Sequence, residues 1–263
     1  MATAVVDGRA IAVMSGVRNN RSITLVWDLA TGRQVGQLRC RMCLAVATTV
    51  VGGRTVAVIG EDMGRVSVWD LSTFQEMDYP LLGHPDMFVD AVCAMSLQGL
   101  PVAVTRSAGG WGARELRAWD LEHGQLLGVP FEPPDDSYVR GMSPFMVDGS
   151  LFLATVCEDD GGKQTIRTWE PATWQEADVC PTGRPVQSRR LTGTISTMSV
   201  NDWPVAIAPD GGGSVRTFFL FGGYEAAELP DPVFPGPVRF LVPAPDGDLL
   251  AGFGQGLALL RRC

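Results

Sequence analysis

The stretch VWDLATG at residues 26–32 decides the fold, because similar stretches recur along the chain. They read VWDLSTF at 68–74, AWDLEHG at 118–124, TWEPATW at 168–174 and TFFLFGG at 217–223. The aromatic position is occupied by Trp27, Trp69, Trp119, Trp169 and Phe218, and Leu260 would take it in a sixth copy. The first three copies continue with Asp28, Asp70 and Asp120. A period of roughly 40 to 50 residues indicates a repeat protein.

A second marker, a pair of turn-forming residues, lies between successive copies. It reads Asp7-Gly8, Gly52-Gly53, Gln98-Gly99, Asp148-Gly149, Asn201-Asp202 and Asp246-Gly247. Each pair separates two apolar runs, as in a tight β-hairpin. The run after each pair is almost continuously apolar, which suits a strand buried on both faces. Each repeat therefore predicts four short strands, a to d, with the pair between a and b and the aromatic residue at the end of c.

Four short strands per repeat with a Trp-Asp dipeptide are typical of a propeller blade, and the chain resembles the WD40-repeat proteins over essentially its full length. The resemblance implies an all-β propeller of six four-stranded antiparallel blades, the last one incomplete, in a single domain over residues 1–263. The expected repeats are 1–40, 41–83, 84–135, 136–187, 188–235 and 236–263.

The composition, rich in Arg, Ala and Gly with a single lysine, Lys163, is typical of a GC-rich, actinobacterial genome. In bacteria, repeats of this kind often form the sensing end of signalling NTPases, proteases or kinases. The resemblance therefore leaves open that the chain is a C-terminal sensor fragment of such a protein.

The chain departs from the pattern of the family, which joins a Gly-His, a Ser or Thr on strand b, an Asp in the b–c turn and the Trp in a buried hydrogen-bonded tetrad. Only one Gly-His is present, at Gly83-His84, and its repeat offers Thr105 and Trp119 but no Asp within 106–114. We expect His84 to bond to Thr105 or Trp119 and to serve the fold. Because no repeat keeps the full set, we expect apolar packing, and not tetrads, to hold the repeats together.

The charge balance excludes several partners. The chain has 21 basic and 29 acidic residues, a net charge of −8, whereas nucleic acids and anionic membranes attract a basic face. No stretch of 18 apolar residues and no basic signal-peptide start occurs. We therefore expect a cytoplasmic protein with reduced cysteines, without nucleic-acid or membrane partners. The oligomeric state stays open.

The sequence contains no complete motif for metal binding or catalysis. Cys40 and Cys43 have the spacing of a zinc knuckle, but no second pair of ligands follows. The acidic pairs Glu61-Asp62 and Asp159-Asp160 fit turns in which the carboxylate caps its own backbone. No catalytic residue, metal or cofactor is expected, so the sequence predicts that the protein is not an enzyme. The alternative is a lactonase-like propeller hydrolase with a central metal.

The connections of the repeats indicate a binding surface. The b–c and d–a connections vary in length while the a–b and c–d turns do not, and both variable connections leave the same end of an antiparallel sheet. Loops on a rigid scaffold usually carry binding specificity, and aromatic residues and Arg are enriched at binding hot spots. The sequence thus predicts a non-catalytic scaffold for a protein or peptide, which binds through Trp111, Phe88, Phe131, Tyr138, Arg184, Arg189 and Arg190.

Overall fold

The computed structural model shows an all-β chain in which antiparallel strands follow one another in sequence order. It describes residues 1–18, 21–78, 81, 83–84, 87–97, 99–108, 115–133, 137–171, 173–177, 191, 195–200, 203–210, 213–220, 234–243, 249–253 and 256–260. These residues form six antiparallel sheets, numbered 1 to 6 in chain order, and the strands of each sheet fall within one repeat of the sequence. The chain divides into two compact units, Met1–Glu132 and Pro133–Cys263.

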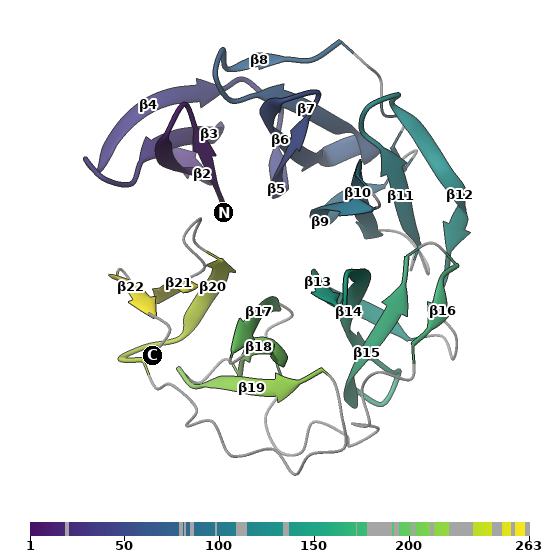
Figure 1. The fold of residues 1–263 in the computed structure, drawn as a ribbon. Coiled ribbons are helices and arrows are strands. Elements are labelled where there is room, and N and C mark those ends of the chain that lie inside the picture. Colours follow the sequence, from purple (N-terminus) through teal and green to yellow (C-terminus); the bar gives the residue numbers. More distant parts are fainter. Residues whose placement is uncertain are drawn as a thin grey trace. The chain divides into compact units, whose positions relative to one another are not determined.

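The first unit contains sheets 1 to 3, each with four strands (Figure 1). Sheet 1 comprises β1 (Ala2–Val6), β2 (Arg9–Arg18), β3 (Arg21–Asp28) and β4 (Arg33–Leu38). Sheet 2 comprises β5 (Cys43–Val51), β6 (Arg54–Glu61), β7 (Val66–Asp70) and β8 (Gln75–Glu76), with the 3-10 turn η1 (Asp62–Gly64) between β6 and β7. Sheet 3 comprises β9 (Phe88–Leu97), β10 (Leu100–Ala108), β11 (Leu116–Asp120) and β12 (Gln125–Phe131).

The second unit contains sheets 4 to 6. Sheet 4 comprises β13 (Tyr138–Val147), β14 (Ser150–Glu158), β15 (Gln164–Glu170) and β16 (Gln175–Glu176). Sheet 5 comprises β17 (Ser196–Val200), β18 (Trp203–Pro209) and β19 (Val215–Phe219). Sheet 6 comprises β20 (Val238–Pro243), β21 (Leu249–Phe253) and β22 (Gly256–Leu260). The expected all-β fold of four-stranded antiparallel repeats is confirmed in sheets 1 to 4, while sheets 5 and 6 each have three strands among the described residues.

Two-residue turns join strands a and b, as the turn markers predict. Val6 pairs with Arg9 across Asp7-Gly8, and Val147 pairs with Ser150 in the same way. Asp7 has a φ of 49° and Gly8 one of 75°, the left-handed values that such tight hairpins need. The sixth marker differs, because Pro243 pairs with Leu249 and the hairpin therefore closes over five residues.

Strands b and c hold most of the buried residues of each complete sheet. Within β6, Val56, Val58 and Ile59 have no exposed surface, as expected from its continuous apolar run. In sheets 1 to 3 the Trp at the end of strand c lies opposite an alanine of strand b, for example Trp69 opposite Ala57, whereas Trp169 in sheet 4 lies opposite Leu153. The small partner leaves room for the indole ring, and apolar cores fill the spaces between sheets 1 and 2 and between sheets 2 and 3.

The described part of the chain contains no helix with the length and apolar character needed to cross a membrane. Its four described cysteines, at positions 40, 43, 93 and 157, are free thiols.

Candidate protein-binding surface

The Asp of each Trp-Asp pair holds the turn between strands c and d. The Asp28 carboxylate accepts hydrogen bonds from the backbone N–H and the hydroxyl of Thr31, at 2.8 and 3.0 Å. Asp70 accepts the same two bonds from Ser72, and Asp120 accepts bonds from the backbone N–H groups two and three positions later. The bonds from Thr31 lower the pKa of Asp28 below its ordinary value. These carboxylates are therefore engaged in turn structure.

A buried chain of hydrogen bonds crosses sheet 3. The Nε2 atom of His84, a residue that is 2% exposed, lies 3.0 Å from the Thr105 hydroxyl, which is one of the contacts expected from the sequence. The indole N–H of Trp119 donates to the same hydroxyl at 2.8 Å. On the other side of the ring, the His84 Nδ1 atom is 3.4 Å from a Glu115 carboxylate oxygen. Glu115, placed just before β11, thus takes the role of the Asp that the sequence lacks.

His84 also ties two connections of the first unit together. Its backbone N–H donates to the Gly64 carbonyl at 2.8 Å, and its own carbonyl accepts a bond from Met87 at 3.2 Å. Gly64 has a φ of 72°, and a side chain at Gly64 or Gly83 would collide with the backbone of the other connection. Burial, and then the nearby Arg117 charge, lower the pKa of His84 to about 4. The neutral ring therefore anchors His84 in sheet 3, while its backbone N–H binds the b–c turn of sheet 2.

Sheet 2 has its own polar network around a fully buried carboxylate, Glu61. This carboxylate accepts bonds from the Ser67 hydroxyl at 2.5 Å, the Arg65 guanidinium at 3.1 Å and the backbone N–H of Arg41 at 2.8 Å. The Trp69 indole N–H donates to the Ser67 hydroxyl at 3.0 Å. The expectation that Glu61 belongs to a self-capped turn is wrong, because it is the last residue of β6 and binds the connection from sheet 1 instead.

Sheet 4 in the second unit repeats this principle with other residues. The Trp169 indole N–H donates to the Thr155 hydroxyl at 2.8 Å, and the Gln164 amide donates to Glu158 at 2.8 Å. The same Gln164 amide bonds both backbone groups of Leu191, at 3.2 and 2.7 Å. Polar networks therefore exist in three sheets beside the apolar cores, so the expectation that apolar packing holds the repeats together is correct only in part.

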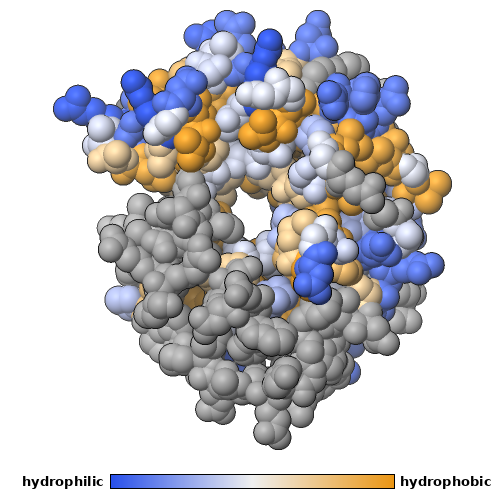
Figure 2. All heavy atoms as spheres, in the orientation of Figure 1, coloured by the Kyte–Doolittle hydropathy of each residue, from blue (hydrophilic) through white to orange (hydrophobic). Residues whose placement is uncertain are grey.

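Exposed apolar side chains lie on these connections, or on the strand ends beside them, in the first unit. We call the surface at the b–c and d–a ends of sheets 1 to 3 the loop face. Its exposed apolar residues are Val17 (76%), Met42 (36%), Leu44 (40%), Met63 (61%) and Phe88 (47%). Figure 2 shows hydrophobic residues reaching the surface over the first unit, among hydrophilic ones. Sequence reasoning had singled out Phe88 alone of these five.

The structure describes three of the seven residues expected to bind a partner. Phe88 is the first residue of β9, Phe131 is the half-buried last residue of β12, and Tyr138 is the first residue of β13 in the second unit. The prediction that they lie in d–a loops is corrected: they are strand ends, because ladder pairing extends to Phe131 opposite Leu116. The other four, Trp111, Arg184, Arg189 and Arg190, lie outside the described residues.

The aromatic positions of the repeats all lie on strand c. Trp69, Trp119 and Trp169 are buried, whereas Trp27 and Phe218 are half-buried. Of the candidate metal ligands, Cys43 is buried and Cys40 half-buried, with the Cys40 sulfur 3.1 Å from the Thr24 hydroxyl. Among the described residues, no three His, Cys, Asp or Glu side chains converge as metal ligands would.

Comparison with known proteins gives the fold. No protein-family model and no curated protein sequence matches the chain. A crystal structure of the RRP9 WD40 repeats aligns with 95% of this chain and 92% of that one, at 14% identity and a TM-score of 0.60. A crystal structure of BBS1N in complex with ARL6DN, soaked with mercury, aligns with 98% of this chain and 79% of that one, at 14% identity and a TM-score of 0.62. The chain therefore has the β-propeller fold seen in WD40-repeat structures.

Proposed function

We propose that the protein is a non-catalytic scaffold that binds a protein or peptide partner through its loop face, where the b–c and d–a connections emerge. The observation that carries the proposal is the exposure of Met63 on the b–c turn of sheet 2 and of Phe88 at the neighbouring start of β9, where buried polar networks hold the backbone in place. Because the backbone that presents them is already ordered, binding does not have to order it, which favours affinity. The solved complex of BBS1N with ARL6DN, which shares this fold, supports a protein as the partner.

Met63 is held in an unfavourable backbone conformation. Its φ is 56°, in the left-handed region, and its side chain is 61% exposed. Non-glycine residues at such values cost about 1 kcal/mol or more, and strain of this kind is concentrated at binding sites. The neighbouring Gly64, bonded to His84, fixes the turn that presents the methionine. A thioether side chain adapts its shape to a partner, which suits an interface.

Phe88 supports the same surface from sheet 3. It is 47% exposed at the start of β9, which packs against the turn η1 that carries Met63. Phe88 therefore lies at the start of a strand that contacts the turn of Met63, directly after a d–a connection. Aromatic anchors at the centre of an apolar patch are typical hot spots. Together the two residues favour a partner that offers apolar side chains.

The wider proposal keeps the other expectations from the sequence. We infer a single domain with six blades, supported by six sequence repeats and six described sheets. The net charge of −8 supports a protein partner over nucleic acid or an anionic membrane. A cytoplasmic location and a bacterial, actinobacterial source remain part of the proposal.

Two substitutions test the loop face without disturbing the fold. Met63→Gly removes the side chain and relieves the left-handed strain, so the fold should be at least as stable, and Phe88→Ser removes an exposed ring. Val129→Ser is the matched control, because Val129 is 74% exposed on the outer strand β12. The measurement is quantitative mass spectrometry of proteins captured from the lysate of the source organism, with thermal melting of each variant.

We expect the wild type and Val129→Ser to capture the same partners in similar amounts. The double variant Met63→Gly/Phe88→Ser should capture about tenfold less of them, which corresponds to a loss of about 1.4 kcal/mol of binding free energy. Equal capture by the double variant and the wild type would refute the loop face as the binding surface.

A further inference from the structure

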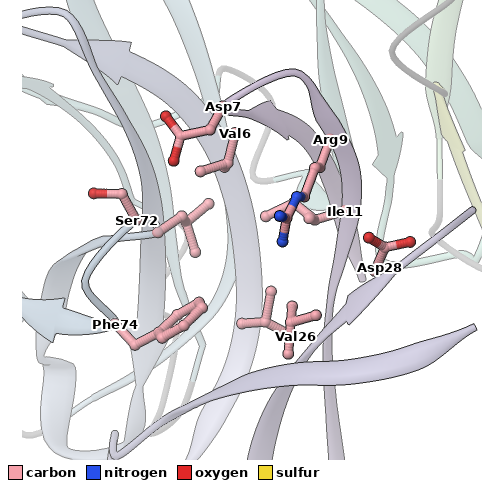
Figure 3. A pocket seen from close by; sticks show the side chains of 10 residues that line it. Val6, Asp7, Arg9, Ile11, Val26, Asp28, Ser72 and Phe74 are labelled. Carbon is pink, nitrogen blue, oxygen red and sulfur yellow. The ribbon is translucent and has the colours of Figure 1, made fainter. Parts of the chain in front are cut away.

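The opposite end of the first unit, which carries the a–b and c–d turns, contains a cavity between sheets 1 and 2. We call this end the turn face. The cavity has a volume of about 290 Å³ and a largely apolar lining that includes Ile11, Val26, Leu71 and Phe74 (Figure 3). Its volume is at the lower end of the range for ligand pockets, which is large enough for one or two side chains and small for most cofactors.

The walls of this cavity are preformed. Val26 and Leu71 are almost fully buried in the core between sheets 1 and 2, so they form a fixed floor. The outer wall is the ring of Phe74, which rests on Gly36 of β4. Val35 on the same strand is 39% exposed at the cavity, so a partner can still cover it.

A second cavity of about 510 Å³ lies beside the same c–d turn, Asp70–Gln75, and most of its lining residues are polar, three of them acidic. It is lined by Asp70, Glu76 and Asp78 against a single base, Arg54. Met77, another lining residue, packs on the core between sheets 2 and 3. The two cavities therefore lie on opposite faces of sheet 2, with the turn as the ridge between them.

The charges around the two cavities favour a basic partner. Asp7 and Asp28 line the first cavity with Arg9, whose side chain reaches toward the middle of the labelled group in Figure 3. In the second, Arg54 lies 3.9 Å from Asp70, while Glu76 pairs with Arg65, which also binds the buried Glu61. Asp78 remains exposed. The linings together hold five carboxylates and two guanidinium groups, a surplus of three negative charges.

We propose that the turn face of the first unit binds an extended peptide segment of a partner protein that inserts one large apolar side chain into the first cavity and lays an Arg or Lys over the second. Cavities on the two faces of one sheet are separated by roughly the 10 Å spacing of packed sheets. An extended chain covers 3.3–3.6 Å per residue, so the two side chains should be about three residues apart. This site is separate from the loop face and independent of it.

The test uses the full-length protein and a phage-displayed library of random nine-residue peptides. Peptides are selected on the wild type and counter-selected on a variant with Val35→Trp, which fills the apolar cavity, and Asp78→Lys, which reverses a charge in the acidic one. Val129→Trp combined with Glu132→Lys is the matched control, since both positions are exposed and line neither cavity. Affinities of the selected peptides are then measured by fluorescence anisotropy.

We expect the selected peptides to share a large apolar residue and an Arg or Lys about three positions apart. Their affinity should fall at least about tenfold for the cavity variant, and likewise when either peptide residue is replaced by Ser, as loss of a buried apolar side chain or of a charge pair predicts. The control variant and Met63→Gly should bind them as the wild type does. The proposal is overturned if no peptides are enriched, if they lack this pattern, or if the cavity variant binds them equally well.

Discussion

The ring of Phe74 in sheet 2 lies so close to Gly36 in sheet 1 that a Cβ atom at Gly36 would sit 2.6 Å from the ring carbons. Phe74 has a φ of 58° at the turn position where sheets 1 and 3 have Gly32 and Gly124, with φ of 64° and 67°. Sheet 2 therefore accepts left-handed strain in its c–d turn, and the ring gains contact with the neighbouring sheet in return.

This contact gives the first prediction. Gly36→Ala should lower the free energy of unfolding by about 1 to 3 kcal/mol, the usual cost of overpacking, because the ring must move off β4. In a Phe74→Leu background the same change should cost much less, since the smaller side chain leaves room. Denaturant unfolding of the four proteins of this double-mutant cycle measures the coupling, and additive effects would show that the two residues do not share the contact.

His84 should make stability depend on pH. Its pKa is about 4 in the fold against an ordinary value of 6.5, so the unfolded chain takes up the proton first as pH falls. The stabilisation is complete above pH 6.5 and should be lost progressively between 6.5 and about 4. Urea unfolding of the wild type and His84→Gln across this range isolates the effect, because Gln does not titrate. Parallel pH curves for both proteins would contradict the assignment of a buried neutral ring.

At a fixed pH near 7, His84→Ala should cost about 1 to 3 kcal/mol, because it leaves the buried Thr105 hydroxyl with one partner fewer. His123 offers the control: it is exposed in a c–d turn, where the bond to Asp120 raises its pKa. His123→Ala should change the free energy of unfolding by much less than His84→Ala, as chemical denaturation of both variants will show.

The Glu61 carboxylate should be a larger determinant of stability. Glu61→Gln replaces one acceptor oxygen with an NH₂ donor, although the site already holds three donors, on Ser67, Arg65 and Arg41. The change should lower the free energy of unfolding by about 2 to 4 kcal/mol. Glu76→Gln removes only the negative charge of the exposed partner of Arg65 and should cost less than about 1 kcal/mol. Thermal or denaturant unfolding measures both losses. Equal losses of stability in the two variants would show that the buried network around Glu61 does not stabilise sheet 2 more than a surface ion pair does.

A single domain with six blades should unfold as one. Calorimetry of the full chain should show one transition whose calorimetric and van't Hoff enthalpies agree. Two resolved transitions, one of them reproduced by residues 1–132 expressed alone, would mean instead that the two compact units fold independently.

Much of this fold could be predicted from local signals. The turn pairs such as Asp7-Gly8 fix strand boundaries because tight hairpins need left-handed φ values, and they fix which strands pair. The Trp positions mark strand c, and the apolar runs mark strand b. Strand d was the least predictable, because no recurring motif marks its end and its length varies: β8 has two residues, whereas β12 continues to Phe131.

The candidate site was less predictable because its partners are distant in sequence. Glu115 lies 31 residues after His84 in the chain, and only the folded sheet brings its carboxylate to the ring. The sequence signal that could have identified Glu115 was its position as an acidic residue directly before strand c. Glu61 looked like half of a turn pair, because nothing local shows that Arg41 and Ser67 converge on it. The turn-face cavities depend on the approach of whole sheets, which no single motif encodes.

The hydrogen bond from the His84 backbone N–H to the Gly64 carbonyl affects which substitutions the chain can tolerate during evolution. This backbone hydrogen bond requires glycine at positions 64 and 83, where a side chain would collide with the facing backbone, but the bond itself involves no side chain. Adjacent repeats held in this way can accumulate substitutions on their surfaces while their backbones stay aligned. This bond thus allows the second and third repeats to diverge in recognition without diverging in architecture.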